Sequence, residues 1–206
     1  LLLKSANEVA NGLAEHVSGS VSGFADLMNQ KAASLGCTNT HFVNPNGLNS
    51  TEHYTTARDM ALIAKAAFEN PTLSQIASTI SYDFPATASV PTVRKLTIGH
   101  KMISSANAEY YQGIVGGKTG YTSLAGNTLV TCAERDGRRL IAVVLKSKQT
   151  HYTDTRALLD YGFAYLTEEQ NQTGSPAGGQ QTGPGGGPSS SPSAGPGVSS
   201  KDVNKW

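Results

Sequence analysis

The sequence predicts an α/β/α sandwich of the α+β type, in which helices cover an antiparallel sheet. Apolar residues recur at helical spacing near the start of the chain and again near residue 160, and β-rich runs lie between them. Two of these runs, residues 127–133 and 140–145, are joined by Asp136-Gly137, a turn pair typical of a hairpin. Helices first, then strands, then a final helix indicate one sandwiched domain.

Two helices are expected in the first part of the chain. The first has Ser5 and Asn7 at its start and Gly19 after its end. Apolar residues three and four positions apart lie on one face of it: Ala6, Val9, Ala10, Leu13, Ala14 and Val17. The second helix is predicted to begin with Ser22 as its N-cap and to close at Gly36.

A third helix and two strands are expected in the middle of the chain. Thr56, with Asp59 three positions later, is typical of a capping-box start, and Asn70-Pro71 is expected to stop the helix. Residues 79–84 and 93–98 then have the composition of two short strands with a Pro-containing connection.

The character of the chain changes near residue 167. Residues 153–166 return to helical spacing, whereas Gly, Pro, Ser, Gln and Thr dominate residues 167–206. Such a composition cannot bury enough apolar surface to offset the entropy that ordering would cost. We therefore expect one ordered domain over residues 1–166 and a disordered Gly/Pro/Ser-rich linker over residues 167–206. Because the chain opens without Met and closes on a linker, truncation at both ends is expected as well.

The composition argues against two classes of partner. The net charge is +1, from 16 Lys and Arg against 15 Asp and Glu, and the basic residues are scattered. This pattern gives no electrostatic case for binding nucleic acid. No apolar run approaches the roughly 18 residues that a membrane helix needs, and Leu1-Leu2-Leu3 is too short for the apolar core of a signal peptide.

Cysteine and histidine usage predicts neither a metal nor a cofactor. Cys37 and Cys132 are the only cysteines, and both have apolar neighbours in the sequence. Two separate buried thiols are therefore favoured over a disulfide or a metal pair. The five histidines are dispersed, and no CxxC or HxxxH spacing occurs.

The stretch with the most distinctive pattern is residues 113–122, in which four glycines surround Lys118-Thr119. Glycines let a ligand approach the backbone closely. A phosphate-binding P-loop would require glycine where Gln112 stands, and a helix directly after Thr119, and neither condition is met. A glycine-rich edge strand without chemistry remains the alternative for this stretch taken alone.

Two motifs far apart in the chain give this stretch a partner. Ser5-Ala6-Asn7 and Lys118-Thr119-Gly120 resemble, in this order, the Ser-x-Asn and Lys-Thr-Gly motifs of the penicillin-recognising serine enzymes. Further blocks resemble the low-molecular-mass D-alanyl-D-alanine carboxypeptidases: residues 44–48, 53–60, 139–145 and 158–163. The resemblance covers residues 1–166 and implies the β-lactamase/DD-peptidase-like transpeptidase fold, incomplete at its N-terminus.

The first motif of that family, Ser-x-x-Lys, does not occur in this sequence. In the family it carries the nucleophile and its activating lysine some tens of residues before Ser-x-Asn, where this chain has only residues 1–4. The nearest approach, Thr92-Val93-Arg94-Lys95, has threonine and comes in the wrong order. The resemblance therefore implies a serine-type D-Ala-D-Ala carboxypeptidase of which this chain is a truncated part, inactive by itself.

The resemblance also implies roles for the residues that are present. In this family a serine expels the terminal D-alanine of a peptidoglycan stem peptide and forms an acyl-enzyme that water hydrolyses. Ser5 would relay a proton to the departing amine. Asn7 would orient the peptide and hydrogen-bond the catalytic lysine.

The Lys-Thr-Gly segment would bind substrate, again by resemblance. Lys118 would attract the free α-carboxylate, and Thr119 would bind it through its hydroxyl group. Gly120 would leave room for an extended peptide against the strand edge. Tyr121 would donate its backbone N–H to the oxyanion.

Other interpretations stay open at this point. A β-lactamase on the same fold would need a deacylating carboxylate in the loop after residue 44, where only Glu52 is available. A non-catalytic cell-wall-binding module is the alternative from a different class. Taken singly, Ser5 is explained equally well as an N-cap and Lys118 as an exposed strand lysine. Residues 99–103 depart from the Asn-rich stretch common in the family.

The resemblance sets expectations for the cellular setting too. It implies an exported, penicillin-sensitive enzyme of the bacterial cell envelope that acts on peptidoglycan stem peptides, binds β-lactam antibiotics and serves peptidoglycan biosynthesis and cell shape. It leaves room for a membrane tether beyond residue 206.

Overall fold

The computed structural model describes residues 1–173 and 204–205, and an antiparallel sheet forms its centre. Strands β4 (Ile114–Thr122), β5 (Gly126–Arg135) and β6 (Arg138–Ser147) are hydrogen-bonded in the order β4-β5-β6. The two-residue turn between β5 and β6 has φ of 51° at Asp136 and 72° at Gly137. Positive φ at both positions is the geometry of a type I′ hairpin turn, so the predicted Asp-Gly hairpin is confirmed.

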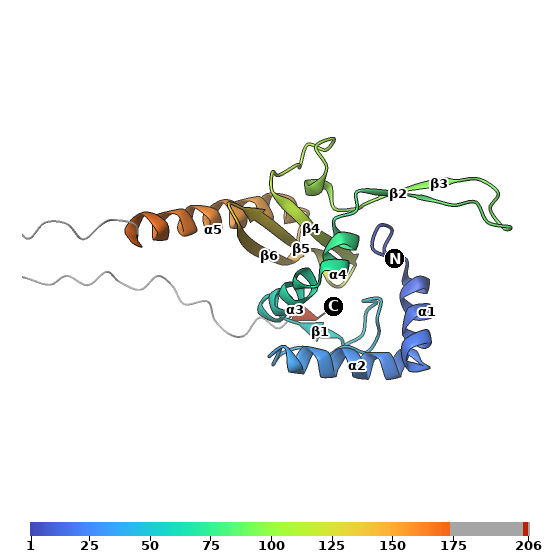
Figure 1. Ribbon diagram of the computed structural model, residues 1–206. Helices are drawn as coiled ribbons and strands as arrows, with labels where there is room; N and C mark the ends of the chain where they lie inside the picture. The colour runs from blue at the N-terminus through green and yellow to red at the C-terminus, as the bar shows by residue number, and fades with distance from the viewer. Residues whose placement is uncertain (174–203, 206) are drawn as a thin grey trace, which may run out of the picture.

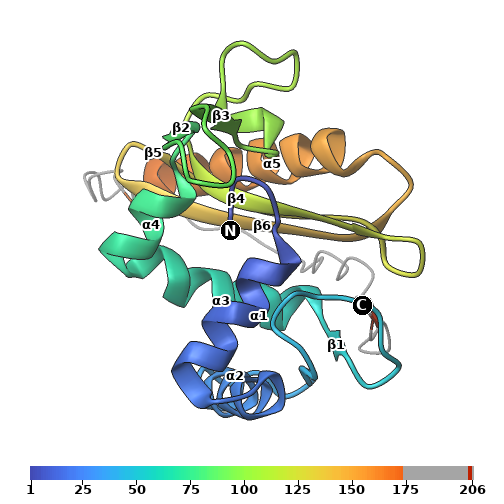
Figure 2. The ribbon, with the colours of Figure 1, turned by 90° about the vertical axis from the view of Figure 1, so that its right-hand side faces the viewer.

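Helices cover both faces of this sheet (Figure 1). Helix α5 (His151–Thr173) packs along one face, against β5 and β6. Helices α3 (Ala57–Glu69) and α4 (Pro71–Ala77) pack on the other face. Figure 2 shows the same layers from the side, with α5 and α3 on opposite sides of the strands. The predicted α/β/α sandwich with an antiparallel sheet is therefore confirmed.

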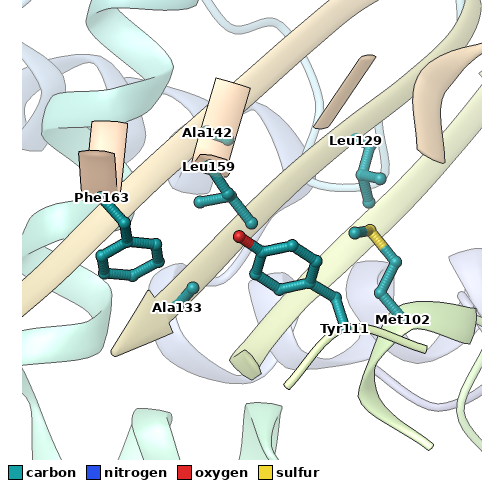
Figure 3. Close-up of a cluster of buried hydrophobic side chains, with 7 residues drawn as sticks. All are labelled: Met102, Tyr111, Leu129, Ala133, Ala142, Leu159 and Phe163. Atoms are coloured by element: carbon teal, nitrogen blue, oxygen red, sulfur yellow. The ribbon is translucent and has the colours of Figure 1, made fainter. Parts of the chain in front are cut away.

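Each face of the sheet has its own apolar cluster, as expected when successive strand residues point to opposite faces. The cluster towards α3 contains Ala64, Phe68 and Cys132. The cluster towards α5 is larger, and Figure 3 shows its members: Met102, Tyr111, Leu129, Ala133, Ala142, Leu159 and Phe163. Full burial of a large apolar side chain contributes roughly 1.5–3 kcal/mol, so this second cluster is the main anchor of the sheet.

The first two helices, α1 (Asn7–Ser18) and α2 (Val21–Ser34), pack on each other beside the sandwich. The chain leaves α1 through Gly19, whose φ of 77° is the left-handed conformation of a C-cap glycine. The predicted cap of α2 is wrong by two positions. Ser20, not Ser22, is the N-cap, and its side chain accepts a hydrogen bond from the Gly23 N–H at 2.9 Å. Because α1 ends just before it, Ser20 is the extended residue that a cap requires.

Thr56 caps α3 as predicted, since its hydroxyl accepts from the Asp59 N–H at 3.1 Å. The Asp59 carboxylate does not complete a capping box. It accepts instead from the Asn39 N–H at 2.8 Å and the Thr40 hydroxyl at 2.7 Å. A buried carboxylate needs such partners, and here they tie α3 to the segment after α2.

The chain resumes a helix directly after Asn70-Pro71, which the sequence predicts only as a stop. Asn70 caps α4 by accepting from the Leu73 N–H at 3.1 Å, and Pro71 occupies the first turn, where its missing N–H costs nothing. The hairpin of β2 (Ser81–Phe84) and β3 (Arg94–Thr97) then projects from the body (Figure 1). Both strands lie within their predicted ranges.

Three short or terminal elements complete the description. A 3₁₀ helix, η1 (Lys101–Ile103), leads from the hairpin towards β4. Strand β1 (Tyr54–Thr55) pairs in antiparallel register with β7 (Asn204–Lys205). Helix α5 continues to Thr173, past residue 166, where the sequence predicts the start of the linker. Residues 174–203 and 206 lie outside the described residues, so the linker stays a prediction for them.

Candidate active-site cleft

A cleft of about 750 Å³ lies between the beginning of α1, helix α2, the loop after Phe42 and strand β4. A smaller cavity of about 330 Å³ adjoins it and shares Ser5, Lys118 and Thr119 with it. The structure brings all six predicted site residues to the larger cleft: Ser5, Asn7, Lys118, Thr119, Gly120 and Tyr121.

The direct link between the two motifs is a hydrogen bond between side chains. The Nζ atom of Lys118 donates to the Oγ atom of Ser5 at 3.0 Å, across 113 positions of sequence. It also donates to its neighbour's carbonyl, Thr119 O, at 2.5 Å. Burial lowers the pKa of Lys118 below its usual value of 10.5. Both hydrogen-bond acceptors are neutral, so this partly desolvated cation is set to attract an anion.

Ser5 lies just outside helix α1 in an unusual backbone conformation. Its φ is 54°, in the left-handed region that non-glycine residues seldom adopt. Ala6 occupies the N-cap position without a side-chain hydrogen bond, so the interpretation of Ser5 as an N-cap is wrong. Asn7 is the first residue of α1 and borders the cleft half-buried.

Strand β4 is an edge strand, which explains how its backbone comes to border a cleft. Among the strands that the structure describes it pairs with β5 alone, with Gly120 opposite Thr128 and Tyr121 opposite Asn127. Tyr121 borders the cleft and is 70% exposed. An edge of this kind can add an extended peptide as a further strand.

Two of the glycines in β4 are required by close packing. A Cβ atom on Gly116 would lie 2.9 Å from the carbonyl oxygen of Ala77, and one on Gly117 would lie 2.5 Å from the Cδ2 atom of His100. Such distances are too short for any side chain. The glycines therefore let α4 and His100 approach the strand that carries Lys118.

His100 is the site residue that the sequence analysis missed. It is 1% exposed, borders the smaller cavity, and its Nε2 atom lies 2.8 Å from the hydroxyl of Thr131. Burial lowers the pKa of His100 to about 4. The only signal in the sequence was the adjacent pair Gly116-Gly117, which predicts a close neighbour without identifying it.

The far wall of the cleft is a loop held to the helices by amide side chains. Asn29 exchanges two hydrogen bonds with the backbone of Phe42, at 2.8 and 2.7 Å. Asn46 donates to the Oδ1 atom of Asn11 in α1 at 2.9 Å. Glu52, the carboxylate that a β-lactamase would need here, is exposed and is not among the residues that border the cleft.

Within the described part of the chain, no three His, Cys, Asp or Glu side chains are grouped so that they could hold a metal ion. Cys37 and Cys132 are buried free thiols, as the sequence predicts, and burial raises the pKa of Cys132 to about 11. No helix among the described residues has the length and hydropathy to span a bilayer.

The edge strand of the sandwich carries a lysine that is hydrogen-bonded to a serine before the first helix. This combination defines the class of DD-peptidase-fold serine enzymes. Residues 1–149 match the family model of peptidase S11, D-alanyl-D-alanine carboxypeptidase. The chain belongs to this family.

The chain is also similar in sequence to individual D-alanyl-D-alanine carboxypeptidases. The chain is 37% identical over 173 residues to the D-alanyl-D-alanine carboxypeptidase DacB2 of Mycobacterium tuberculosis, covering 80% of this chain and 56% of that protein. It is 32% identical to DacF of Bacillus subtilis, covering 84% of this chain and 44% of that protein. The chain thus spans about half the length of these relatives.

Solved structures give the same picture. A crystal structure of a D-alanyl-D-alanine carboxypeptidase from Mycobacterium tuberculosis matches with a TM-score of 0.68 and 37% identity, over 80% of this chain and 61% of that one. A mutant Streptomyces DD-transpeptidase matches with a TM-score of 0.72 and 30% identity, over 80% of this chain and 65% of that one.

Proposed function

We propose that this chain forms the substrate-binding part of a serine-type D-Ala-D-Ala carboxypeptidase, which removes the terminal D-alanine from peptidoglycan stem peptides through an acyl-enzyme. The observation that carries the proposal is the 3.0 Å hydrogen bond from Lys118 to Ser5 at the cleft. It joins the two family motifs at one site, beside an open strand edge.

Lys118 supplies the cation for the substrate's terminal α-carboxylate. In the free cleft its charge is partly desolvated and bonded only to neutral oxygens. Burial deprives the ammonium group of part of its hydration. The substrate carboxylate replaces that stabilisation, because it forms a charge-assisted hydrogen bond with the ammonium group. Thr119 adds a hydroxyl bond to the same group, so the site prefers a peptide with a free C-terminus over its amide.

The peptide backbone lies against the edge of β4. Gly120 leaves that edge unobstructed, and the backbone N–H of Tyr121 stabilises the oxyanion that forms at the scissile carbonyl. The last peptide bond of an extended peptide in this position lies between Lys118 and the start of helix α1.

Ser5 and Asn7 act on the reacting bond from the opposite wall. When the C–N bond breaks, the departing D-alanine amine needs a proton, and a hydroxyl held by Lys118 can relay one because it both accepts and donates. The Asn7 amide orients the peptide carbonyl. Water then hydrolyses the serine ester and completes the cycle.

The attacking serine belongs to a Ser-x-x-Lys motif that the 206 residues do not contain. The proposal therefore assigns the complete activity to a longer polypeptide that carries this motif, and it predicts that the 206-residue chain alone is inactive. It also includes the setting inferred from the resemblance: an exported envelope protein that takes part in peptidoglycan biosynthesis and cell shape and binds β-lactams.

Labelling with a fluorescent penicillin tests this function. The 206-residue chain is expected to stay unlabelled, whereas a longer gene product with Ser-x-x-Lys is expected to form a stable adduct and to release D-alanine from a diacyl peptide ending in D-Ala-D-Ala. Stable labelling of the short chain would refute the assignment of the nucleophile. Rapid penicillin hydrolysis over many turnovers would replace the peptidase with a β-lactamase.

A further inference from the structure

His100 lies directly behind the strand that carries Lys118. A Cβ atom on Gly117 would come within 2.5 Å of its Cδ2 atom and 2.7 Å of its Nε2 atom, so the ring is seated on the backbone of β4. Successive strand residues point to opposite faces. The ring therefore supports β4 on the face opposite the Lys118 side chain, one residue before it.

The hydrogen bonds of the ring define its protonation state. The Nδ1 atom accepts from the backbone N–H of Met102 at 3.3 Å, and a backbone N–H can only donate. The proton of the neutral ring is therefore on Nε2, which donates to the Thr131 hydroxyl at 2.8 Å. Thr131 is the cross-strand partner of Gly117. One imidazole thus connects η1, β4 and β5.

The residue before His100 lies near Thr119, the next residue of the motif. A Cβ atom on Gly99 would lie 3.4 Å from the Oγ1 atom of Thr119, which is ordinary van der Waals contact. His100 therefore lies against Gly117 and Gly99 lies near Thr119. These are the positions directly before and after Lys118 in β4. The smaller cavity is bordered by this same segment.

We propose that His100 is a positioning residue, whose neutral ring against Gly117 fixes the place of Lys118 and Thr119 in the cleft. The inference rests on the proposed function for its ligand, but the positioning itself can be measured without any ligand.

The surrounding charges favour the neutral ring. Burial is the dominant effect on the pKa of His100; a backbone hydrogen bond opposes it, His151 on α5 and Lys118 on β4 add to it, and the pKa is about 4. Lys101 follows His100 in η1, and Glu109 and Asp154 lie close to His151. Protonation at Nδ1 would break the bond from Met102 and place a second cation behind Lys118. Positioning should therefore be lost as the pH falls towards 4.

Amide hydrogen exchange of the 206-residue chain tests the positioning. In His100→Ala we expect the protected amides of residues 116–120 to exchange at least tenfold faster, while those of Ala142 and Val144 in β6 change less than twofold. His100→Asn, which can keep a polar bond without titrating near pH 4, should recover at least half of the protection. His16→Asn, on the exposed end of α1, is the matched control and should change nothing.

A ligand titration then connects positioning to binding. A diacyl peptide ending in D-Ala-D-Ala should bind His100→Ala at least tenfold more weakly than the wild type, and its C-terminal amide should show no such difference. Between pH 6.5 and 4 the wild type should lose protection in residues 116–120, and His100→Asn should not.

The possible results separate the two proposals. Faster exchange confined to residues 116–120 without any peptide binding by the wild type would contradict the proposed function and support the positioning role. An equal loss of protection across β4, β5 and β6, or none at all, would overturn the positioning role. Loss of protection at low pH that persists in His100→Asn would do the same.

Discussion

The two sides of the cleft bury different amounts of apolar side-chain surface. On the sheet side, Leu129 and Leu159 are almost completely buried between the sheet and α5. On the helical side, the buried residues of α1 and α2 are alanines only: Ala10, Ala14, Ala25 and Ala32. The larger apolar residues of α1 stay exposed: Val9 by 41%, Leu13 by 49% and Val17 by 61%. Since stabilisation scales with apolar area removed from water, the sheet side carries most of it.

The candidate site lies across this boundary. Lys118 belongs to the well-packed sheet, whereas Ser5 belongs to the thinly packed helical side. Their hydrogen bond joins a lysine on a densely packed strand to a serine on a sparsely packed segment. The cation that would meet the substrate is therefore held by packing, and the serine opposite depends on fewer contacts.

Matched leucine truncations should expose this contrast most strongly. Leu159→Ala removes a side chain that is 1% exposed from the cluster under α5 and should lower the free energy of unfolding by about 3 kcal/mol. Leu13→Ala on α1 should change it by less than about 0.5 kcal/mol. Urea denaturation measures both, and equal losses would contradict the comparison.

Glycine substitutions give the next largest difference. Gly117→Ala places a Cβ atom against the carbonyl oxygen of Val130 and the His100 ring, and should cost about 2 kcal/mol. Gly12 in α1 has nothing within 4 Å of such an atom. Gly12→Ala should therefore stabilise the protein by up to about 1 kcal/mol through helix propensity. Thermal melts of the pair would show opposite shifts in Tm, and a shift of the same sign would refute the argument.

Removing the cation at the boundary should affect binding rather than folding. Lys118→Ala should weaken binding of a peptide with a free C-terminal carboxylate by about 2 kcal/mol and leave its amide unaffected. Lys65→Ala, an exposed α3 lysine beside Glu69, is the control.

The same titration has a defined pH dependence. Because burial lowers the pKa of Lys118, the ammonium loses its proton below the 10.5 of a free lysine. Affinity for the carboxylate should therefore fall as the pH rises, and the fall should begin below pH 10.5. An affinity that stays constant to pH 10.5 would argue against Lys118 as the binding group.

The smallest expected effect concerns the start of α2. Ser20→Ala removes the side-chain bond to the Gly23 N–H and should cost about 1 kcal/mol. Ser22→Ala, at the position that the sequence pattern favoured as the cap, should cost almost nothing. The reverse order in chemical denaturation would restore the sequence-based assignment.

The sequence predicted elements well wherever one local signal acted alone. The glycine that ends α1, the Thr56 cap and the Asp136-Gly137 turn each depend on neighbouring residues only. The prediction was correct but incomplete where two signals are combined. Asn70-Pro71 ends one helix and begins another, and the pattern contains no information on which outcome the sheet will support.

The site shows the same division. Ser5 and Lys118 could be paired from the sequence because a family pattern joins them. His100 could not, because its role comes from a contact with a backbone atom, and no residue type predicts which distant glycine it will meet. Its burial depends on the arrangement of η1, β4 and β5 together, which only the folded chain provides.

The left-handed backbone at Ser5 has a consequence for laboratory evolution. At a φ of 54°, a side chain costs about 1 kcal/mol or more relative to glycine. Selection for heat tolerance alone should therefore enrich Ser5→Gly early, with a gain in melting temperature and no loss of yield. The same variant lacks the hydroxyl that Lys118 contacts. A screen that scores only thermal resistance would thus collect proteins without that hydroxyl, whereas a screen that also scores turnover of the longer enzyme would keep the serine.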